Sequence, residues 1–380
     1  MIYKHGNECP VCSGAMRSII DLPDLPMTEL YEPWDVYFER GRARVNQEFL
    51  YCDGCSHGKL GTIVPPEQLY KQGYRTTTSK SAGAAKAIST FAEFIGANCN
   101  HGNYECAIDI GANDGSLLDL LPQKLRVAVD PNSRRGQQPM ETINAFIEDA
   151  DLSAFKSRRK LVCCSHTLEH IEKQNEFFAK LSTLVSHGDL CAFQFPSLDY
   201  LVRDCRIDQI HHQHIHYYSL RSISLMLAKH GFEITHHEFD ASHYGTLMVM
   251  FQRGIETLKG EQIPTFRVTQ ANALFRKEMW ELNARLDWHK ELYGYGASLM
   301  LPVLYYYLPS LARLQYVMDE DASKHGQRYV NFNVKIVPVE DVTGRDVMVT
   351  AFNTKRAVRA IVSKLFSAGA ENVIVPFHVL

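Results

Sequence analysis

The chain has 380 residues, of which 45% are hydrophobic and 22% charged, and its formal net charge is −3. This composition is typical of a soluble globular protein with two or three domains. The small net charge gives no electrostatic reason to expect a nucleic acid or an anionic membrane as partner. The N-terminus, MIYKHGNECP, lacks the apolar run of a signal peptide, so we expect a cytoplasmic protein.

Four of the ten cysteines form two C-x-x-C pairs in the first segment of the chain. Cys9 and Cys12 make the first pair, and Cys52 and Cys55 follow after an expected strand at 44–51. Two such pairs can place four thiolates around one Zn²⁺ ion. The segment is poor in helical periodicity, and a metal can replace a hydrophobic core. We therefore expect a structural zinc domain over residues 1–75, with redox-active dithiols as the alternative.

A polar connection, 70–87, leads into an expected helix at 84–95, and a glycine turn follows. Residues 106–132 have the pattern of strand, glycine turn, helix and second strand. Gly111 and Gly115 allow backbone N–H groups to approach a ligand at the helix N-terminus. Asp130, at the end of the second strand, can accept hydrogen bonds from ribose hydroxyls.

The turn reads D-I-G-A-N-D-G and resembles the S-adenosylmethionine (SAM) motif of class I methyltransferases. A βαβ turn without a ligand is the alternative. Asp149 follows an apolar run and is a candidate for binding the adenine, and Ser165-His166 end the next expected strand, 161–165. The residues expected to bind the cofactor are Gly111, Ala112, Asn113, Asp114, Gly115, Asp130, Pro131, Asp149, Ser165 and His166.

The expected elements continue in an α/β order to residue 254. Apolar residues recur at helical spacing over 168–185, and Gly231 closes a helix at 219–230. Expected strands at 190–195, 232–238 and 246–251 complete a mostly parallel sheet. We assign residues 76–254 to a SAM-binding domain.

The last part of the chain predicts a charged helical bridge at 255–290 and a second α/β domain at 291–380. The uncharged run 292–312 has the length of a membrane span, but its glycines and prolines favour a buried strand, turn and helix. A strand at 314–318 follows, with later strands at 334–337, 346–351 and 373–377. The turn Gly294-Tyr295-Gly296-Ala297 predicts either a nucleotide site or a purely structural turn.

The expected fold class is therefore α/β. A class I (Rossmann-like) SAM methyltransferase core lies between a small N-terminal zinc-binding domain and a C-terminal Rossmann-like domain.

Four histidines occur within the segment 208–219, which reads DQIHHQHIHYYS. Histidines act as general bases near neutral pH, and this segment follows the carboxyl end of a strand, where open α/β sheets bind ligands. Two alternatives stay open. His212, His214 and His216 would share one face of an extended chain and could bind a metal, or the histidines could be incidental to a polar loop.

The order of these motifs over essentially the whole chain resembles the SAM-dependent C-methyltransferases that act on nucleotide-linked 4-keto deoxysugars. The family segment Y-H-E-H-x-S-Y-F-S aligns with H-H-Q-H-I-H-Y-Y-S here. The resemblance implies that His214 removes the C3 proton of the sugar, and that His211 and Gln213 replace the tyrosine and glutamate beside the keto group. It further implies active-site roles for Tyr74 and His170.

Three more positions are implied to bind the substrate, and two of the motifs differ from the family. The family's H-G-G-S motif aligns with H-Y-G-T at 243–246, so the resemblance implies that His243 and Tyr244 bind the substrate. Tyr295, the first residue of the C-terminal Y-G-A turn, is implied to bind it as well. The lysine and glycine that usually follow this turn are absent, which indicates an altered substrate.

The sequence therefore predicts a zinc-containing, SAM-dependent C-methyltransferase of a nucleotide sugar, without nucleic-acid or membrane partners and either monomeric or homodimeric. An O-methyltransferase, and a SAM-binding protein without turnover, are the alternatives.

Overall fold

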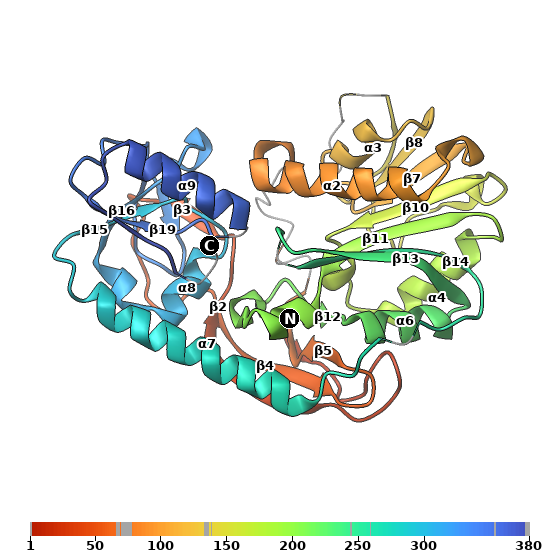
Figure 1. Cartoon of the computed structure of the whole chain (residues 1–380), viewed down its shortest axis with the longest axis horizontal. Helices are drawn as coiled ribbons and strands as arrows, with labels where there is room; N and C mark the ends of the chain where they lie inside the picture. Colours follow the sequence, from red (N-terminus) through yellow and green to blue (C-terminus); the bar gives the residue numbers. More distant parts are fainter. Residues whose placement is uncertain are drawn as a thin grey trace.

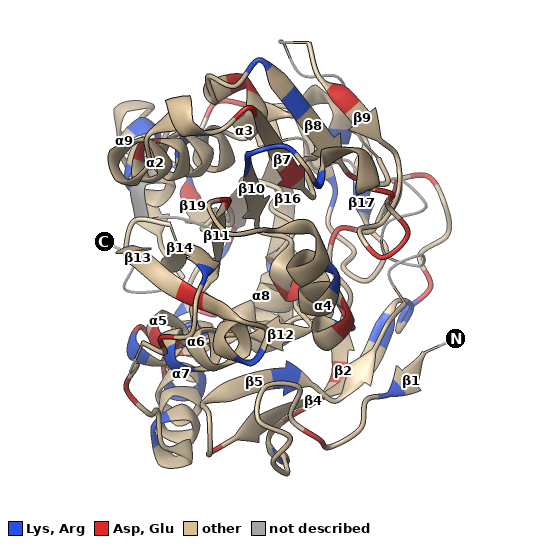
Figure 2. Ribbon diagram, turned by 90° about the vertical axis from the view of Figure 1, so that its right-hand side faces the viewer, with Lys and Arg blue, Asp and Glu red and all other residues tan. Residues whose placement is uncertain are grey.

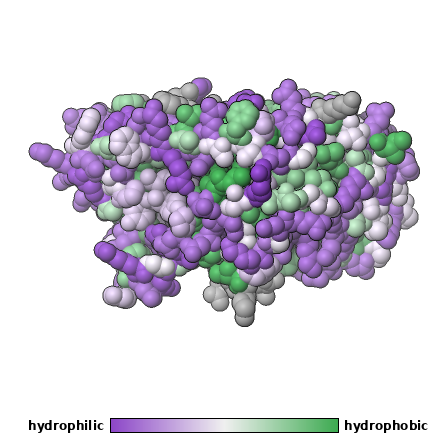
Figure 3. Space-filling model, turned by 90° about the horizontal axis from the view of Figure 1, so that it is seen from below, coloured by the Kyte–Doolittle hydropathy of each residue, from purple (hydrophilic) through white to green (hydrophobic). Residues whose placement is uncertain are grey.

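The computed structural model describes residues 2–376 apart from 66–68, 70–77, 133–136, 138, 244, 259 and 353–354. An N-terminal antiparallel sheet, a central seven-stranded sheet and a C-terminal five-stranded sheet follow one another along the chain (Figure 1). Acidic and basic residues are interspersed over the face drawn in Figure 2, and the face drawn in Figure 3 is mostly hydrophilic. Among the described residues, no helix is long and apolar enough to cross a membrane.

The N-terminal sheet includes one strand from the predicted histidine segment. Its order is β12-β5-β4-β2. These strands are β2 (Arg17–Pro26), β4 (Arg44–Cys52), β5 (His57–Leu60) and β12 (His216–Tyr217). Beside them, β1 (Tyr3–Lys4) pairs with β6 (Thr62–Ile63). Because β12 pairs antiparallel with β5, the N-terminal domain directly positions the histidine segment.

The central sheet has the order β13-β14-β11-β10-β7-β8-β9, with an antiparallel β13–β14 pair at one edge. Its strands are β7 (Cys106–Ile110), β8 (Leu125–Val129), β9 (Glu141–Ile143), β10 (Lys160–Ser165), β11 (Leu190–Pro196), β13 (Phe232–Asp240) and β14 (Thr246–Arg253). Its helices are α2 (Ala82–Asn98), α3 (Ser116–Leu120), α4 (Gln174–Leu184), α5 (Leu198–Arg203) and α6 (Leu220–Lys229).

Helices α2 and α3 cover one face of this sheet, and α4 and α6 cover the other (Figure 1). Alternate strand residues supply the two cores, as a strand period of two requires: Ala107 packs beneath α2, whereas Ile108 packs against α4. This is the predicted class I methyltransferase core, so the fold class is confirmed.

One predicted helix is shorter than expected. A 3-10 turn occupies Leu168–His170, and α4 begins only at Gln174. The Gln174 side chain donates to the carbonyls of Leu168 and Ile171, which stabilises the break between the two elements. The break has a functional consequence because it changes the direction of the side chains at 169 and 170.

The C-terminal sheet is parallel, with the order β18-β16-β15-β19-β20. Its strands are β15 (Leu292–Tyr295), β16 (Leu314–Met318), β18 (Ile336–Val337), β19 (Asp346–Val349) and β20 (Asn372–Ile374), and its helices are α8 (Leu301–Tyr307) and α9 (Lys355–Ser367). The uncharged run 292–312 forms β15 and α8, a buried strand and helix as predicted. Helix α7 (Thr265–Leu286) lies within the predicted bridge.

The first and last parts of the chain share one hydrophobic core. Ile20 and Leu22 of β2 pack in the same cluster as Phe275 of α7 and Leu301 of α8. A short antiparallel pair joins β3 (Tyr31–Pro33) to β17 (Gln327–Tyr329). The buried ion pair between Glu32 and Arg328, 3.0 Å apart, lies in this pair of strands.

Candidate cofactor and active site

A cavity of about 860 Å³ lies at the carboxyl ends of β7, β8 and β10. Its volume is in the range of roughly 300–1,000 Å³ that small-molecule sites occupy. Leu299 and Ala351 of the C-terminal domain close it on the opposite side. Ten of the predicted site residues line it: Gly111, Ala112, Asn113, Asp130, Pro131, Asp149, Ser165, His166, His170 and His243.

The glycine turn at the base of this cavity has no room for a side chain at Gly111. Its φ angle is +77°, and a Cβ atom there would lie 1.9 Å from Oγ1 of Thr167. The backbone N–H of Asn113 donates to Oδ2 of Asp130 at 3.0 Å, and the backbone N–H of Asn132 donates to Oδ1 of Asp130 at 2.7 Å. The Asp130 carboxylate is thereby held at the cavity, where a ribose could donate to its remaining lone pairs.

Asp114 and Gly115 do not line the cavity, although the sequence predicts cofactor binding for both. The Asp114 carboxylate accepts hydrogen bonds from the Ser79 amide at 2.8 Å and the Ser116 hydroxyl at 2.5 Å. Gly115 is the N-cap of α3, with a φ angle of +76°. Both residues therefore support the turn from behind.

Asp109 lines the cavity and was missed by the sequence prediction. It is 2% exposed, and its Oδ1 atom has no hydrogen-bond partner. Burial, together with the negative charges of Asp130 and Asp114, raises the pKa of the Asp109 carboxyl to about 8. The sequence feature that could have revealed Asp109 is its position as the acid within an otherwise apolar strand, CAIDI at 106–110. A buried carboxylate of this kind is stabilised by a bound cation, and SAM carries a sulfonium and an ammonium group.

We expect SAM binding to release a proton from Asp109. At pH 7 the empty site holds a protonated carboxyl, and a cation bound beside it lowers the pKa, so affinity rises with pH from 6 to 8. Asp109→Asn should bind SAM about tenfold more weakly, equivalent to ~1.4 kcal/mol, without proton release. Calorimetry at pH 7 in buffers of different ionisation enthalpy measures the proton, and exposed Asp35→Asn is the control. Equal proton release in the Asp109 variant would contradict this assignment.

Histidines gather at the far end of the cavity. The His214 ring centroid lies 5.1 Å from that of His170 and 4.1 Å from that of His211, and the His166 and His243 centroids lie 5.3 Å apart. Burial lowers the pKa of His211 and of His243 to about 3 and holds the pKa of His214 well below its ordinary value. These imidazoles are neutral at pH 7, the form that can accept a proton.

The connection between His170 and the histidine segment is direct. Nδ1 of His170 lies 2.7 Å from the carbonyl oxygen of Gln213. A carbonyl only accepts, so Nδ1 carries the proton and Nε2 is left unprotonated in the neutral ring. The Gln213 side chain turns away from the cavity and donates to Glu29 at 3.3 Å.

The predicted alternative of a metal held by His212, His214 and His216 is wrong for the described residues. His212 donates to the Leu25 carbonyl at 3.1 Å, and His216 donates to the Glu172 carbonyl and contacts His57. The chain turns at 212–213 and then pairs with β5, so the three rings do not share a face. None of the potential metal-binding groups among the described residues contains His212 or His216.

Three other predicted residues lie apart from the cavity or outside the described part of the chain. Tyr74 and Tyr244 fall outside the described residues. Tyr295 is 5% exposed and does not line the cavity, and its hydroxyl donates to Glu320 at 2.7 Å.

Glu169 was also missed by the sequence prediction. It is 3% exposed, and neither carboxylate oxygen has a hydrogen-bond partner. Its Oε1 lies 3.4 Å from Nδ1 of His166 and 4.0 Å from Nε2 of His170. The helical spacing over 168–185 predicts that residues 168 and 171 are buried and that residue 169 is not. The 3-10 turn that forms there instead buries residue 169 as well. The acid directly before His170 was the available signal.

The four paired cysteines converge on one point. All four Sγ atoms lie within 4.8 Å of one another. The close pairs, Cys9–Cys55 at 3.5 Å and Cys12–Cys52 at 3.4 Å, join the two C-x-x-C units. A tetrahedral ion with bonds of about 2.3 Å separates its sulfurs by about 3.8 Å, so the set fits one zinc ion.

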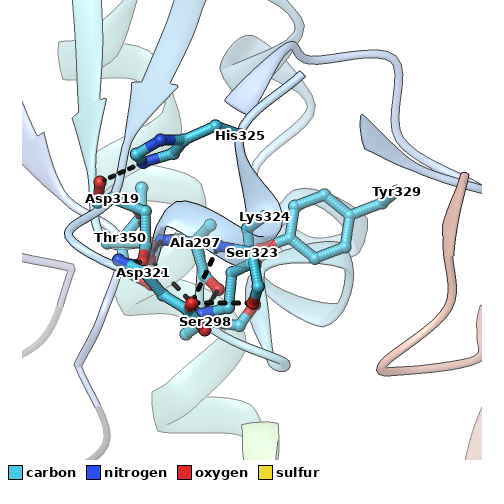
Figure 4. A network of polar contacts seen from close by, with 10 residues as sticks. Ala297, Ser298, Asp319, Asp321, Ser323, Lys324, His325, Tyr329 and Thr350 are labelled. Atoms are coloured by element: carbon cyan, nitrogen blue, oxygen red, sulfur yellow. Dashed lines mark hydrogen bonds and ion pairs between the residues drawn. The ribbon is translucent and has the colours of Figure 1, made fainter. Parts of the chain in front are cut away.

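The hydrogen-bonding groups of the C-terminal glycine turn are paired with protein groups (Figure 4). The Asp319 carboxylate accepts from the Ala297 amide at 2.6 Å, and Lys324 donates to the Ala297 carbonyl at 3.0 Å. Ser298 donates to the Thr350 carbonyl at 2.7 Å. These contacts favour the structural alternative for this turn. Lys324 also brings an ammonium group to a turn that lacks the family's lysine.

The fold, the glycine turn and the cavity are together typical of a class I SAM methyltransferase domain. Residues 82–237 match the family described as "Methyltransferase domain". The match covers less than half of the chain, so it identifies this central region alone as a methyltransferase domain.

A curated relative, C-methyltransferase NovU of Streptomyces niveus, is 22% identical over 211 residues. The match covers 53% of this chain and 50% of NovU, about half the length of each protein. Similar solved structures include magnesium protoporphyrin IX methyltransferase (ChlM) from Synechocystis PCC 6803 with bound SAH, at 16% identity and a TM-score of 0.35. That match covers 50% of this chain and 92% of ChlM. Another is mitomycin 7-O-methyltransferase MmcR, at 13% identity and a TM-score of 0.35, covering 50% of this chain and 62% of MmcR.

Proposed function

We propose that this enzyme transfers the methyl group of SAM to a carbon atom, C3, of a nucleotide-linked 4-keto deoxysugar. The observation that carries the proposal is the continuity of one cavity from the glycine turn to His166, His170 and His243, with His214 directly behind His170. A proton acceptor is thus available beside the expected methyl donor. Similarity to a C-methyltransferase supports carbon as the acceptor.

In the proposed mechanism, His214 accepts the proton from the carbon next to the keto group. Acidity beside a carbonyl makes this carbon a feasible nucleophile, because the charge moves onto the keto oxygen as an enolate. Bound SAM supplies the electrophilic methyl group. Gly111, Asn113 and Asp130 would hold the cofactor, and His170 and His211 would orient the base and exclude water from it.

The alternative is an O-methyltransferase, and a specific observation favours it. The amide of Gln213 donates to Glu29, and His211 replaces the family's tyrosine, so the usual groups beside the keto oxygen are absent or engaged elsewhere. On a hydroxyl acceptor, the same histidine would remove an O–H proton and no enolate would form.

We also propose that Cys9, Cys12, Cys52 and Cys55 hold one structural zinc ion.

Mass spectrometry of nucleotide 4-ketosugars, incubated with the protein and SAM in light and heavy water, tests this function. C-methylation predicts a gain of one methyl group that resists acid and base, together with loss of the exchangeable position beside the carbonyl. Methylation of only the reduced, hydroxyl form of the sugar would establish the O-methyl alternative. Bound SAM without transfer to any sugar would overturn both.

A further inference from the structure

One buried carboxylate, that of Glu169, lies among the imidazoles at the end of the cavity. Its oxygen is 3.4 Å from the His166 ring and 4.0 Å from the His170 ring, and a His214 ring nitrogen lies within 4.8 Å. The side chain is 3% exposed and both oxygens lack a hydrogen-bond partner. An anion placed in this way interacts strongly with any positive charge formed nearby, because little water screens it.

Such a positive charge has to form when a buried histidine acts as a base. Burial disfavours an imidazolium, and the other rings around His214 supply no negative charge. Residue 213, where the related family has a glutamate, is a glutamine whose amide is hydrogen-bonded to Glu29. The acid of the segment 208–219, Asp208, is paired with Arg206, and the 3-10 turn instead brings a carboxylate within 4.8 Å of a His214 ring nitrogen.

We propose that Glu169 is the anionic positioning residue of the base, supplying an unpaired negative charge near His214 from the 3-10 turn Leu168–His170. This inference rests on the proposed deprotonation by His214. The substrate C–H proton moves to the imidazole and the electron pair stays on the substrate, while Glu169 forms and breaks no bond. Its carboxylate stabilises the imidazolium electrostatically, because one of its oxygens lies within 4.8 Å of ring nitrogens of both His170 and His214.

The titratable groups that face Glu169 come from three elements. His166 and Cys164 lie at the end of β10, His170 belongs to the same turn, and His214 and Tyr217 belong to the histidine segment. Because Glu169 is the only carboxylic acid of this set, its neutralisation removes the carboxylate charge that the set places near His214.

The first experiment measures proton removal separately from methyl transfer. Exchange of the proton beside the keto group is followed in heavy water, with the demethylated cofactor SAH in place of SAM. We expect Glu169→Gln to slow this exchange about 100-fold, without a change in SAH affinity, and Glu169→Asp to recover part of the rate. Exposed Glu141→Gln is the matched control. An unchanged exchange rate in Glu169→Gln would overturn the proposal.

The second experiment needs no substrate. Nitrogen-15 NMR titration of the imidazoles should show His214 titrating at least about one pH unit lower in Glu169→Gln than in wild type, the equivalent of a tenfold change in proton affinity. If wild type exchanges no ketosugar proton, the proposed function fails, and this titration alone decides on Glu169. Unchanged titration would overturn the charge role. A second metal ion per chain, bound by wild type but not by Glu169→Gln, would also overturn it, since Glu169 would then be a metal ligand.

Discussion

Replacement of His214 by alanine should lower methyl transfer about 1,000-fold, within the range of roughly 10²–10⁴ that a general base contributes. SAM affinity should stay within about twofold of wild type, because His214 is not among the residues that line the cavity. Turnover of the accepted ketosugar and calorimetric titration with SAM measure the two effects. Thermal unfolding verifies that the variant is folded.

The control for this variant is His237→Ala, which removes an exposed histidine from β13. The control should keep full turnover. If His214→Ala also kept it, the base would have to be one of the histidines that line the cavity, His166, His170 or His243.

Serine in place of Cys55 should remove the zinc ion and unfold the N-terminal sheet. Cys55 is fully buried, and structural zinc contributes about 10–16 kcal/mol of apparent binding free energy in small zinc domains. Activity should fall with it, since His216 pairs with Lys59 of β5 and His212 contacts Gln47 of β4. Loss of the metal therefore releases the segment that carries His214.

Elemental analysis and hydrogen exchange measure these effects. We expect one zinc ion per wild-type chain and none in the variant, with faster exchange at both 44–60 and 209–217. Cys99→Ser, which changes a half-buried thiol outside the cluster, should alter neither. A Cys55→Ser protein that retained zinc and slow exchange would argue against the metal site.

The central fold could be predicted from sequence because its signals are local. Strands β7, β8 and β16 coincide with apolar runs that end in an acid or a glycine, and α6 lies between Ser219 and Gly231 as capping rules require. The central strands β7, β10 and β11 are buried on both faces, so they read as nearly continuous apolar runs that the sequence shows directly.

The active-site end could be predicted only in part, because its geometry depends on distant residues. His212 and His216 are directed by Leu25 and His57 of the N-terminal sheet, which no local pattern around 211–216 reveals. Glu169 is buried by a 3-10 turn within a stretch whose period suggests a regular helix. Asp109 lies in the buried strand β7, where the sequence pattern predicts a residue of the hydrophobic core. Its role at the cavity becomes clear only from the structure, in which a carboxylate oxygen is buried without a hydrogen-bond partner.

The core shared by β2, α7 and α8 has a consequence for synthesis on the ribosome. The chain emerges from its N-terminus, so Ile20 and Leu22 leave the exit tunnel long before Phe275 and Leu301, their eventual neighbours. The central sheet has all its strands by Arg253 and can close first. The N-terminal segment must wait with an uncovered apolar face. A nascent chain whose Arg253 has left the exit tunnel while α7 is still inside it should therefore recruit chaperones through β2, even though its central sheet is already complete.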